Sequence, residues 1–287
     1  MIKSLLGIEP QQEPDGSYRP SKFAMKLGTS DTTDFSDLAY DKYEGPRKKI
    51  LVIATEQKNM TMQNGKKFST GNHPVETLLP MLHLRNAGFE FEIATPTGAP
   101  VVLEMWAFPK DDHHVNDYYA EVKDSFNNPL SLADFVATSL GDHEQYAAVF
   151  TPGGHGAMLG LPDDPNVATV LNWAHDNDLF TISLCHGPVA LLATALDGNF
   201  LYDGYDLAVF PDSVDKQTPM IGYLPGKMPS LVSTKLADLG ANVVNKKADD
   251  TVCVDRKLIS GASPGAANPI GELAAKTLLA HAKKNNW

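Results

Sequence analysis

The sequence predicts an α/β fold, a doubly wound and mostly parallel sheet with helices on both faces. Three observations predict it. Short apolar runs alternate with longer segments that have apolar residues at helical spacing, which is the order of alternating strands and helices. Glycine-rich turns follow several of the apolar runs. The 287 residues, 43% of them hydrophobic, are enough for one large domain with an elaboration.

The elements are predicted in chain order. Residues 1–45 are rich in Pro, Asp, Ser, Thr and Gln and predict an irregular N-terminal arm before the α/β domain at 46–287. The run at 50–55 is apolar throughout, typical of a strand buried on both faces, whereas 89–95 alternates and predicts a place near the sheet edge. Further strands are predicted at 146–151, 180–185, 205–210, 242–244 and 251–260, and helices at 73–87, 130–140, 167–176, 187–196, 229–239 and 269–284.

Two features interrupt this pattern. Pro80 should kink the helix at 73–87, and Gly88 should end it. Residues 97–130 contain aromatic and charged residues without a clean period, so we interpret them as an insertion or small subdomain.

Composition argues against several classes of protein. The net charge of −11 disfavours binding to a nucleic-acid backbone, which requires a basic surface. The two cysteines, Cys185 and Cys253, do not suggest a disulfide framework and favour a reducing compartment. The apolar run at the start is too short for a signal sequence, and no run has the length of a membrane span. We therefore expect a cytoplasmic protein that binds no membrane.

The segment TISLCHGPVA at 181–190 contains the strongest candidate for chemistry. Apolar residues run up to Cys185, a turn follows, and a helix begins. Ligands of such sheets bind beyond the carboxyl ends of the strands, so we expect Cys185 there, in a strained elbow with its sulfur exposed. Gly187 supplies backbone freedom and Pro188 suits a first helical turn. The helix N-terminus should stabilise the thiolate and lower the pKa of the cysteine.

Two neighbouring observations bear on this interpretation. Cys253 alternates with Val252 and Val254 and has no such turn after it, so we interpret it as structural. For Cys185 the alternative is an inert core residue. A second turn, TPGGHG at 151–156, follows a strand. Paired glycines allow backbone N–H groups to approach a ligand, as in an oxyanion hole, although such a turn alone often only reverses the chain.

These motifs resemble a known superfamily. SLCHGP at 183–188 and FTPGGHG at 150–156 are similar to the PfpI-type superfamily, relatives of the class I glutamine amidotransferases. STGNHPVETLLP, DGYDLAVF and FPDSVDKQTPMIGYLPG resemble its long bacterial branch, which contains a heat-shock chaperone also described as glutathione-independent glyoxalase III and as a protein deglycase. The resemblance covers roughly 46–280 and implies a flavodoxin-like fold.

The resemblance implies roles for particular residues. Cys185 would be the nucleophile, His186 its imidazole partner, and Asp215 the carboxylate that orients the histidine. Glu76, in NHPVET, would be an acid beside the cysteine with a raised pKa, able to move a proton. The backbone N–H groups of Gly154 and His186 would form the oxyanion hole.

Alternatives remain for the carboxylates. Asp212 competes with Asp215, and either side chain is otherwise a solvated turn residue, which is the better interpretation of Asp212. Without the resemblance, Glu76 would be an acid in the first turn of a helix, where it complements the helix dipole.

The resemblance predicts no metal site. Some members of the branch have a His-Glu-His site, and the matching positions here are Arg85, Glu90 and Val122. Only the carboxylate is a suitable ligand, and we expect Arg85 to pair with Glu90. The tandem His113–His114 is interpreted as part of a solvated polar loop rather than as a metal site.

Together these features predict a cofactor-independent enzyme. It would convert 2-oxoaldehydes such as methylglyoxal to 2-hydroxy acids through a hemithioacetal on Cys185, with oxidation and reduction both internal to the substrate. Protein deglycation would begin at the same thiol, so the sequence does not separate the two activities. A chaperone that holds unfolded proteins and a weak aminopeptidase are further alternatives. Members of the family are commonly homodimers, so we expect a homodimer.

Overall fold

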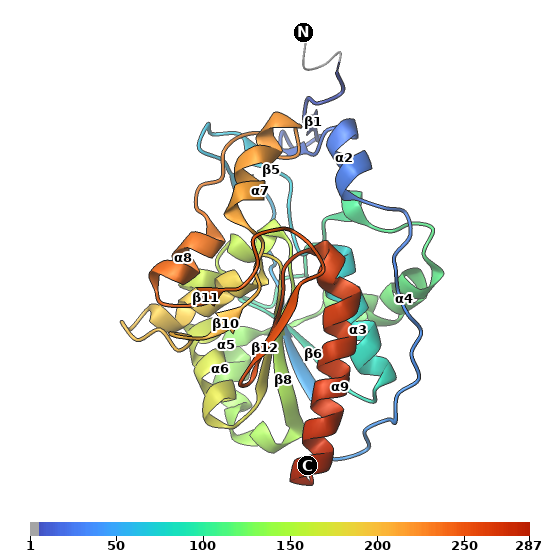
Figure 1. The fold of residues 1–287 in the computed structure, drawn as a ribbon, viewed down its shortest axis with the longest axis vertical. Helices are drawn as coiled ribbons and strands as arrows, with labels where there is room; N and C mark the ends of the chain where they lie inside the picture. Colours follow the sequence, from blue (N-terminus) through green and yellow to red (C-terminus); the bar gives the residue numbers. More distant parts are fainter. Residues whose placement is uncertain (1–5) are drawn as a thin grey trace.

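The computed structural model describes residues 6–287, and its centre is a seven-stranded sheet (Figure 1). The strand order is β12-β13-β9-β8-β3-β6-β7. The strands are β3 (Lys49–Ile53), β6 (Glu90–Thr95), β7 (Leu130–Ser131), β8 (Tyr146–Thr151), β9 (Phe180–Leu184), β12 (Val252–Asp255) and β13 (Leu258–Gly261). All neighbouring pairs are parallel except β12 and β13. The predicted α/β fold with a mostly parallel sheet is confirmed.

The central strands are apolar because both of their faces are covered. In β3, Ile50 and Val52 belong to one buried core cluster, whereas Leu51 and Ile53 belong to another. Successive side chains of a strand point to opposite faces of the sheet, so the two clusters lie on opposite sides of it. The continuous apolar run is therefore typical of a doubly covered parallel sheet.

Helices cover each face, as predicted. The first core cluster includes residues of α3 (Pro74–Asn86), α4 (His113–Asn127) and α9 (Ala267–Asn285). The second includes residues of α5 (Leu132–Thr138), α6 (Pro165–Asp176), the 3-10 helix η5 (Gly187–Ala195) and α8 (Val232–Asp238). In Figure 1, α3 and α9 lie side by side along one face of the sheet.

The connections contain short elements. They are α7 (Asp212–Gln217) and the 3-10 helices η1 (Met105–Ala107), η2 (Leu140–Gln145), η3 (His155–Met158), η4 (Leu161–Asp163), η6 (Thr218–Met220) and η7 (Pro264–Ala266). Helix α3 continues through Pro80, and Gly88 follows its end with a φ of +96°. This left-handed conformation suits glycine and explains the predicted helix end.

The N-terminal arm contains regular structure that its composition did not predict. Strands β1 (Gln11–Gln12) and β2 (Tyr18–Arg19) join β5 (Lys67–Phe68) and β4 (Met60–Thr61) in a four-stranded sheet, and α2 (Lys22–Gly28) follows. The expectation of an irregular arm is therefore wrong for these segments. Strands of two residues are too short to show a period in the sequence.

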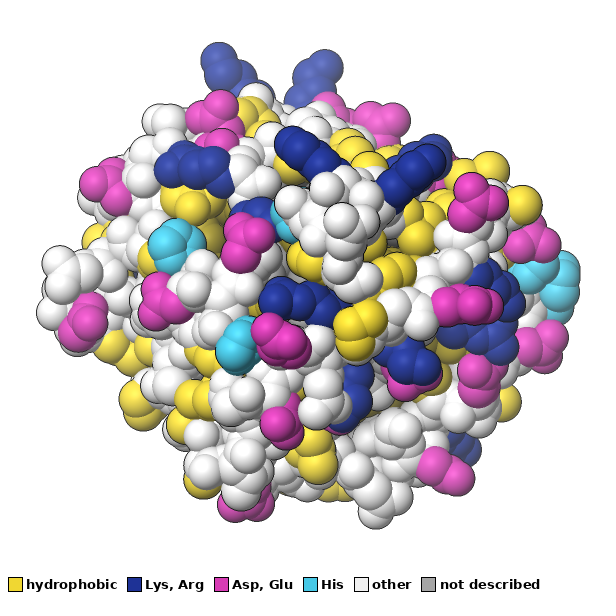
Figure 2. Space-filling view, turned by 90° about the horizontal axis from the view of Figure 1, so that it is seen from below, with side chains coloured by type: hydrophobic (Ala, Val, Ile, Leu, Met, Phe, Trp, Pro, Cys, Tyr) yellow, Lys and Arg dark blue, Asp and Glu magenta, His cyan; other side chains and the backbone are white. Residues whose placement is uncertain are grey.

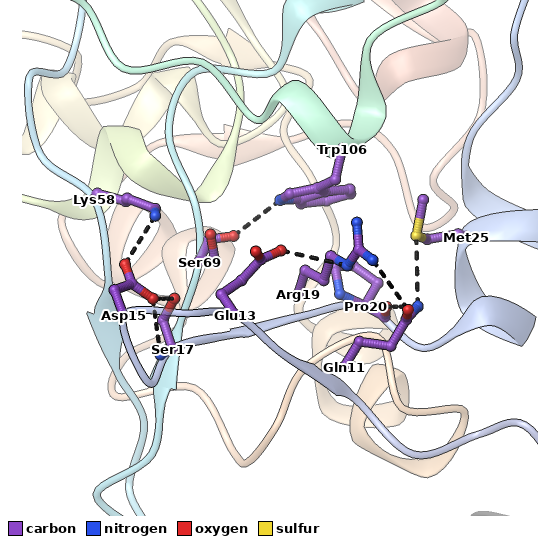
Figure 3. A network of polar contacts seen from close by, with 10 residues as sticks. All are labelled: Gln11, Glu13, Asp15, Ser17, Arg19, Pro20, Met25, Lys58, Ser69 and Trp106. Carbon is purple, nitrogen blue, oxygen red and sulfur yellow. Dashed lines mark hydrogen bonds and ion pairs between the residues drawn. The ribbon is translucent and has the colours of Figure 1, made fainter.

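Polar contacts fix the arm to the rest of the molecule (Figure 3). Lys58 Nζ lies 2.8 Å from Asp15 Oδ2, and Arg19 Nε lies 3.3 Å from Glu13 Oε1 within the arm. The Ser21 hydroxyl accepts a hydrogen bond from the Ala24 amide at 3.0 Å and so caps α2. The same hydroxyl donates to the Ile221 carbonyl at 2.8 Å, which places α2 against the loop after η6.

Two strand predictions are wrong in detail, and the segment at 97–130 contains a helix that its sequence did not predict. The segment 251–260 is a hairpin of β12 and β13, turned at Arg256 with a φ of +52°, rather than one strand. The run at 205–210 forms only β10 (Asp206–Leu207), which pairs with β11 (Asn242–Val243) outside the main sheet. The irregular region at 97–130 contains α4, because three buried residues, Val115, Tyr118 and Phe126, give it one apolar face.

The surface at the end where α9 finishes has no dominant charge. Figure 2 shows Lys, Arg, Asp and Glu side chains interspersed there with apolar ones. Over residues 6–287, no helix is both long and apolar enough to cross a membrane.

Candidate active site

The carboxyl ends of β8 and β9 border a cavity of about 410 Å³. The titratable side chains of its lining are His73, Glu76, Glu104, His155, Cys185, His186 and Tyr223. Helix α2 of the arm also lines it, through Ala24 and Leu27. The structure therefore brings the predicted Cys185, His186 and Glu76 to one cavity. It lies at the carboxyl ends of the strands, where ligands of this fold class bind.

Cys185 occupies a strained turn. Its φ is +60°, a left-handed conformation that costs a residue with a Cβ about 1–3 kcal/mol. Its amide donates to the Gly261 carbonyl at 2.8 Å, and its carbonyl accepts from the Phe210 amide at 2.9 Å. A Cβ at Gly187 would collide with the Thr151 carbonyl, so only glycine fits directly after Cys185 and His186. The surrounding backbone thus holds the strained conformation that the turn composition predicts.

Two expectations for Cys185 are wrong. The residue is 3% exposed, so its sulfur faces the cavity and not the surface. Burial, followed by the nearby Glu76 carboxyl and Asp215, raises the pKa of the thiol well above its ordinary value, although the His186 amide lowers it. Desolvation of a thiolate outweighs the helix N-terminus here. The resting sulfur is a neutral thiol that requires a base.

His186 is placed to be that base. Its Nδ1 lies 3.4 Å from Cys185 Sγ, and its Nε2 lies 2.9 Å from Asp215 Oδ2. An ionised carboxylate only accepts hydrogen bonds, so Nε2 is the protonated nitrogen and Nδ1 is free to accept the thiol proton. The ring also stacks on Phe210, with centroids 4.7 Å apart. This is the arrangement implied by the sequence motifs.

Asp215 is ionised, and Asp212 has a different task. Burial opposes the ionisation of Asp215, but His186 and His155 outweigh it and hold its pKa below its usual range. Asp212 accepts hydrogen bonds from the amides of Ser233 and Thr234, at 3.0 and 2.8 Å, and so fixes the start of α8. The structure thus separates a carboxylate beside His186 from one that supports a helix.

His155 is a site residue that the sequence interpretation missed. Its Nε2 lies 3.0 Å from Asp215 Oδ1, and its ring centroid lies 3.9 Å from that of His186. Asp215 therefore bonds two histidines, one through each oxygen. TPGGHG was interpreted only for its glycines, although a histidine after β8 must lie near one after the adjacent β9. That adjacency is the signal that could have found it.

Glu76 is buried against the cysteine without a normal hydrogen-bond partner. The residue is 0% exposed, and among the described residues neither carboxyl oxygen has a partner of good geometry. Burial raises its pKa well above the ordinary value, while the Cys185 thiol and the Gly154 amide act in the opposite direction. A Cβ at Gly153 would collide with Glu76 Oε2, which explains one glycine of the pair. Burial therefore favours the protonated form of Glu76.

The two amides predicted for an oxyanion hole belong to residues of the cavity lining. The Gly154 amide lowers the pKa of Glu76, and the His186 amide lowers that of Cys185. Gly154 has a φ of +105°, and a Cβ there would collide with the Gly71 carbonyl. Their use as an oxyanion hole remains a prediction.

Three further polar side chains line the cavity and were not predicted. Burial raises the pKa of Glu104 to about 7, with His155 opposing the shift. Burial, followed by His155, lowers the pKa of His73 to about 3, so this ring is neutral at pH 7. Burial raises the pKa of Tyr223 well above its usual value, so its hydroxyl stays protonated and able to donate. No local sequence pattern marks these three positions as parts of a site.

The positions that match the metal ligands of some family members contain ion pairs and an apolar residue. Arg85 Nη2 lies 2.6 Å from Glu121 Oε2, and Glu90 Oε1 lies 3.0 Å from Lys48 Nζ, so the expected Arg85–Glu90 pair is wrong. Val122 packs against the first core cluster. These side chains do not form a ligand set.

One group of possible metal ligands exists in the described part of the chain. Donor atoms of His155, His186 and Asp215 all lie within 4.8 Å of one another. Each Asp215 oxygen already bonds one of the histidines. A metal ion would therefore have to replace the hydrogen bonds that orient His186.

Comparison with known proteins places the chain in a family. No family model matches the chain. The protein/nucleic acid deglycase HchA of Escherichia coli O157:H7 is 47% identical over 266 residues, which cover 93% of each protein. The chain belongs to the HchA family. Protein/nucleic acid deglycase 1 of Escherichia coli K12 is also 47% identical over 266 residues.

Solved structures share the fold of this chain. The Rapid Encystment Protein of Francisella tularensis has a TM-score of 0.67 at 20% identity, covering 80% of this chain and 99% of that one. Glyoxalase III of Candida albicans has a TM-score of 0.61 at 24% identity, covering 79% and 96%. A ThiJ/PfpI domain protein of Brachyspira murdochii has a TM-score of 0.52 at 13% identity, covering 82% and 99%. These similarities support the flavodoxin-like fold implied by the motifs.

Proposed function

We propose that this chain converts 2-oxoaldehydes such as methylglyoxal to 2-hydroxy acids without glutathione, through a hemithioacetal on Cys185. One observation supports this most directly: a thiol, its base His186 and the neutral acid Glu76 meet in one cavity. The relatives at 47% identity are named protein/nucleic acid deglycases. Deglycation removes an adduct that an aldehyde has formed with an amino group. Their name supports chemistry at an aldehyde-derived carbon.

The first step forms the carbon–sulfur bond. Nδ1 of His186 takes the thiol proton, and the sulfur attacks the aldehyde carbon C1 of the substrate. The carbonyl oxygen gains a proton, which Glu76 is placed to give because its carboxyl group is neutral. Asp215 stabilises the imidazolium that forms, through the 2.9 Å hydrogen bond to Nε2.

The next steps move a hydrogen and then release the product. Removal of the C1 proton gives an enediolate, and protonation of C2 gives a thioester of the 2-hydroxy acid. Water then cleaves the thioester, so the thiol is regenerated and one water has been added. C1 is oxidised while C2 is reduced, and no external oxidant or reductant enters the balance.

The same thiol supports a second candidate function, deglycation. The observation that favours it is the name of the relatives, which includes protein and nucleic acid. Cys185 would attack the hemiaminal carbon, the amine would leave, and the remaining steps would be identical. A net charge of −11 argues against tight binding of a phosphate backbone, so small adducts and proteins are the better substrates of this second function.

A lactate assay without glutathione tests the proposal. Wild type should form lactate from methylglyoxal, Cys185→Ser should not, and Cys253→Ser should match wild type. Equal lactate formation by Cys185→Ser would contradict the proposal. With an arginine adduct of methylglyoxal, an initial rate above spontaneous release of the aldehyde would favour deglycation, whereas a rate at that limit would favour the free aldehyde.

Holding-chaperone activity and a homodimeric state stay predictions. Suppression of a client's thermal aggregation by Cys185→Ala would separate a chaperone role from the chemistry. Sedimentation of the purified protein would test the dimer.

A further inference from the structure

The proposed chemistry uses one part of the cavity and leaves the rest to the substituent of the substrate. The reacting groups are Cys185, His186 and Glu76. The cavity of about 410 Å³ is within the range of pockets that hold drug-sized ligands, roughly 300–1,000 Å³, and methylglyoxal is much smaller than such a ligand. Once C1 is bonded to the Cys185 sulfur, the group carried by C2 extends into the remaining space. The lining there decides which 2-oxoaldehydes fit.

The remaining lining is mostly apolar. Ala24 and Leu27 of α2 and Ile221 after η6 contribute apolar side chains to it. Apart from the titratable residues, only Thr218 and Ser263 of the described lining have polar side chains. Both hydroxyls already donate to backbone carbonyls. The substituent of the substrate therefore meets a surface that has few free polar groups.

The charges of the lining oppose an anionic substituent. In the described chain the lining contains two carboxyl groups, Glu76 and Glu104, and no lysine or arginine. His73 is neutral at pH 7, since burial lowers its pKa to about 3. A carboxylate or phosphate on the substituent would therefore lose water without gaining a lysine or arginine as its partner, which is unfavourable.

Helix α2 is held beside the cavity by contacts with the loop after η6. The Ser21 amide donates to the Gly222 carbonyl at 2.8 Å, and the Ser21 hydroxyl donates to the Ile221 carbonyl at 2.8 Å. The arm passes Gly222 so closely that a Cβ there would collide with the Ile8 carbonyl. The wall that α2 forms is therefore a fixed part of the cavity.

Leu27 lies at the mouth of the cavity. Its side chain lines the cavity and yet is 65% exposed, whereas Ala24 lines the cavity and is 1% exposed. The two lysines of the same helix, Lys22 and Lys26, are exposed and do not belong to the lining. Helix α2 thus turns apolar side chains toward the cavity and its cations away from it.

We propose that Leu27 and the apolar wall of α2 select 2-oxoaldehydes with an apolar, uncharged substituent over those that carry a carboxylate or phosphate. An apolar group on C2 would displace water from Leu27 and Ala24, which is favourable. An anionic group would have to leave water for a lining in which the described residues include no lysine or arginine. The covalent steps are those of the proposed function, on which this inference rests.

Three aldehydes test the inference. Methylglyoxal carries a methyl group, 2-oxohexanal an apolar butyl group, and 4,5-dioxopentanoate a chain of similar length that ends in a carboxylate. The measurement is kcat/KM for 2-hydroxy acid formation without glutathione. For wild type we expect roughly 10-fold or more in favour of 2-oxohexanal over methylglyoxal. We also expect roughly 10-fold or more in favour of 2-oxohexanal over 4,5-dioxopentanoate.

Leu27→Lys is the decisive variant, and Leu196→Lys is its control. Leu196 is 52% exposed and lies outside the lining, so both substitutions add the same charge at an exposed leucine. Leu27→Lys should raise kcat/KM for 4,5-dioxopentanoate relative to 2-oxohexanal by roughly 5-fold, because it places a cation at the mouth. Added salt should weaken this gain, since salt screens exposed charges. Leu196→Lys should leave the ratio as in wild type.

The outcomes separate the inference from the proposed function. If wild type converts the three aldehydes equally well, or if Leu27→Lys and Leu196→Lys change the ratio alike, the inference is wrong and the proposed function stands. Leu27→Ala should keep the wild-type melting temperature and lose part of the preference for 2-oxohexanal over methylglyoxal, and an unchanged preference would contradict the role of Leu27. If wild type forms no 2-hydroxy acid from any of the three, the proposed function itself fails.

Discussion

The two cysteines of the chain lie in opposite kinds of environment. Cys185 directly follows strand β9, is 3% exposed, and has a histidine nitrogen 3.4 Å from its sulfur. Cys253 lies in β12 at the edge of the sheet and is partly exposed, with its sulfur 3.6 Å from the Asp206 carbonyl. In the described part of the chain, the more accessible cysteine is therefore the one whose sulfur has no histidine as a hydrogen-bond partner.

The pKa values of the two thiols shift in the same direction. Burial raises the pKa of both thiols, with Glu76 adding to the shift at Cys185 and Asp206 at Cys253. A lowered resting pKa therefore does not distinguish the candidate nucleophile. What distinguishes it is a base in contact with the sulfur and a cavity for the substrate. Reactivity here depends on proton transfer during the reaction.

The largest expected effect follows from replacing each sulfur in turn. Cys185→Ser should lower kcat/KM for a 2-oxoaldehyde by on the order of 10⁴-fold or more, as expected when a nucleophile is lost. Cys253→Ser should leave it unchanged, because Cys253 is not part of the cavity lining in the described structure. Lactate formation without glutathione measures both. Equal losses in the two variants would remove the distinction between the cysteines.

The second effect tests the carboxylates near Cys185. Asp215→Asn should lower kcat/KM by roughly 10²- to 10⁴-fold, because an amide cannot stabilise the imidazolium of His186. Asp212→Asn is the matched control and should lower the melting temperature, since Asp212 supports α8. Its kcat/KM should stay close to wild type below that temperature. A larger catalytic loss in Asp212→Asn would reverse the assignment.

The third effect concerns the pH dependence of thiol alkylation. Glu76 raises the pKa of Cys185, so Glu76→Gln should shift the alkylation of Cys185 by iodoacetamide to lower pH. Alkylation of Cys253 should not shift, because burial, Asp206 and Asp255 set its pKa. Mass spectrometry of each cysteine peptide across a pH series measures both at once. A common shift would indicate a general change in the fold, and no shift at Cys185 would show that Glu76 does not act on it.

The sequence predicts the elbow well and its surroundings poorly. The buried strand and the residues Cys185 and Gly187 that follow it are close together in the sequence. Their spacing alone therefore predicts the turn and its position at the carboxyl ends of the strands. The burial of the sulfur depends on α2 and on the loop after η6, which meet only in three dimensions. The thiol pKa depends on that burial, and for this reason its predicted direction was wrong.

The same limit applies to the other site residues. His155 and Asp215 are 60 residues apart, and their contact depends on how α7 is placed beside η3. Glu104 lies before a 3-10 helix of three residues, a segment without periodicity. Motif resemblance found Asp215 and Glu76, whereas no local pattern marks Glu104 or the second histidine.

The smallest effect separates the cysteines by stability. Cys253→Ala should lower the free energy of unfolding by about 1 kcal/mol or less, because it removes a partly exposed side chain and one weak S–H hydrogen bond. Its strand keeps the ladder with Ser260, since those bonds belong to the backbone. Urea unfolding of Cys253→Ala and wild type would measure the difference. A loss of several kcal/mol would show that β12 depends on this side chain, and Cys253 would then be a core residue rather than a neutral comparison for Cys185.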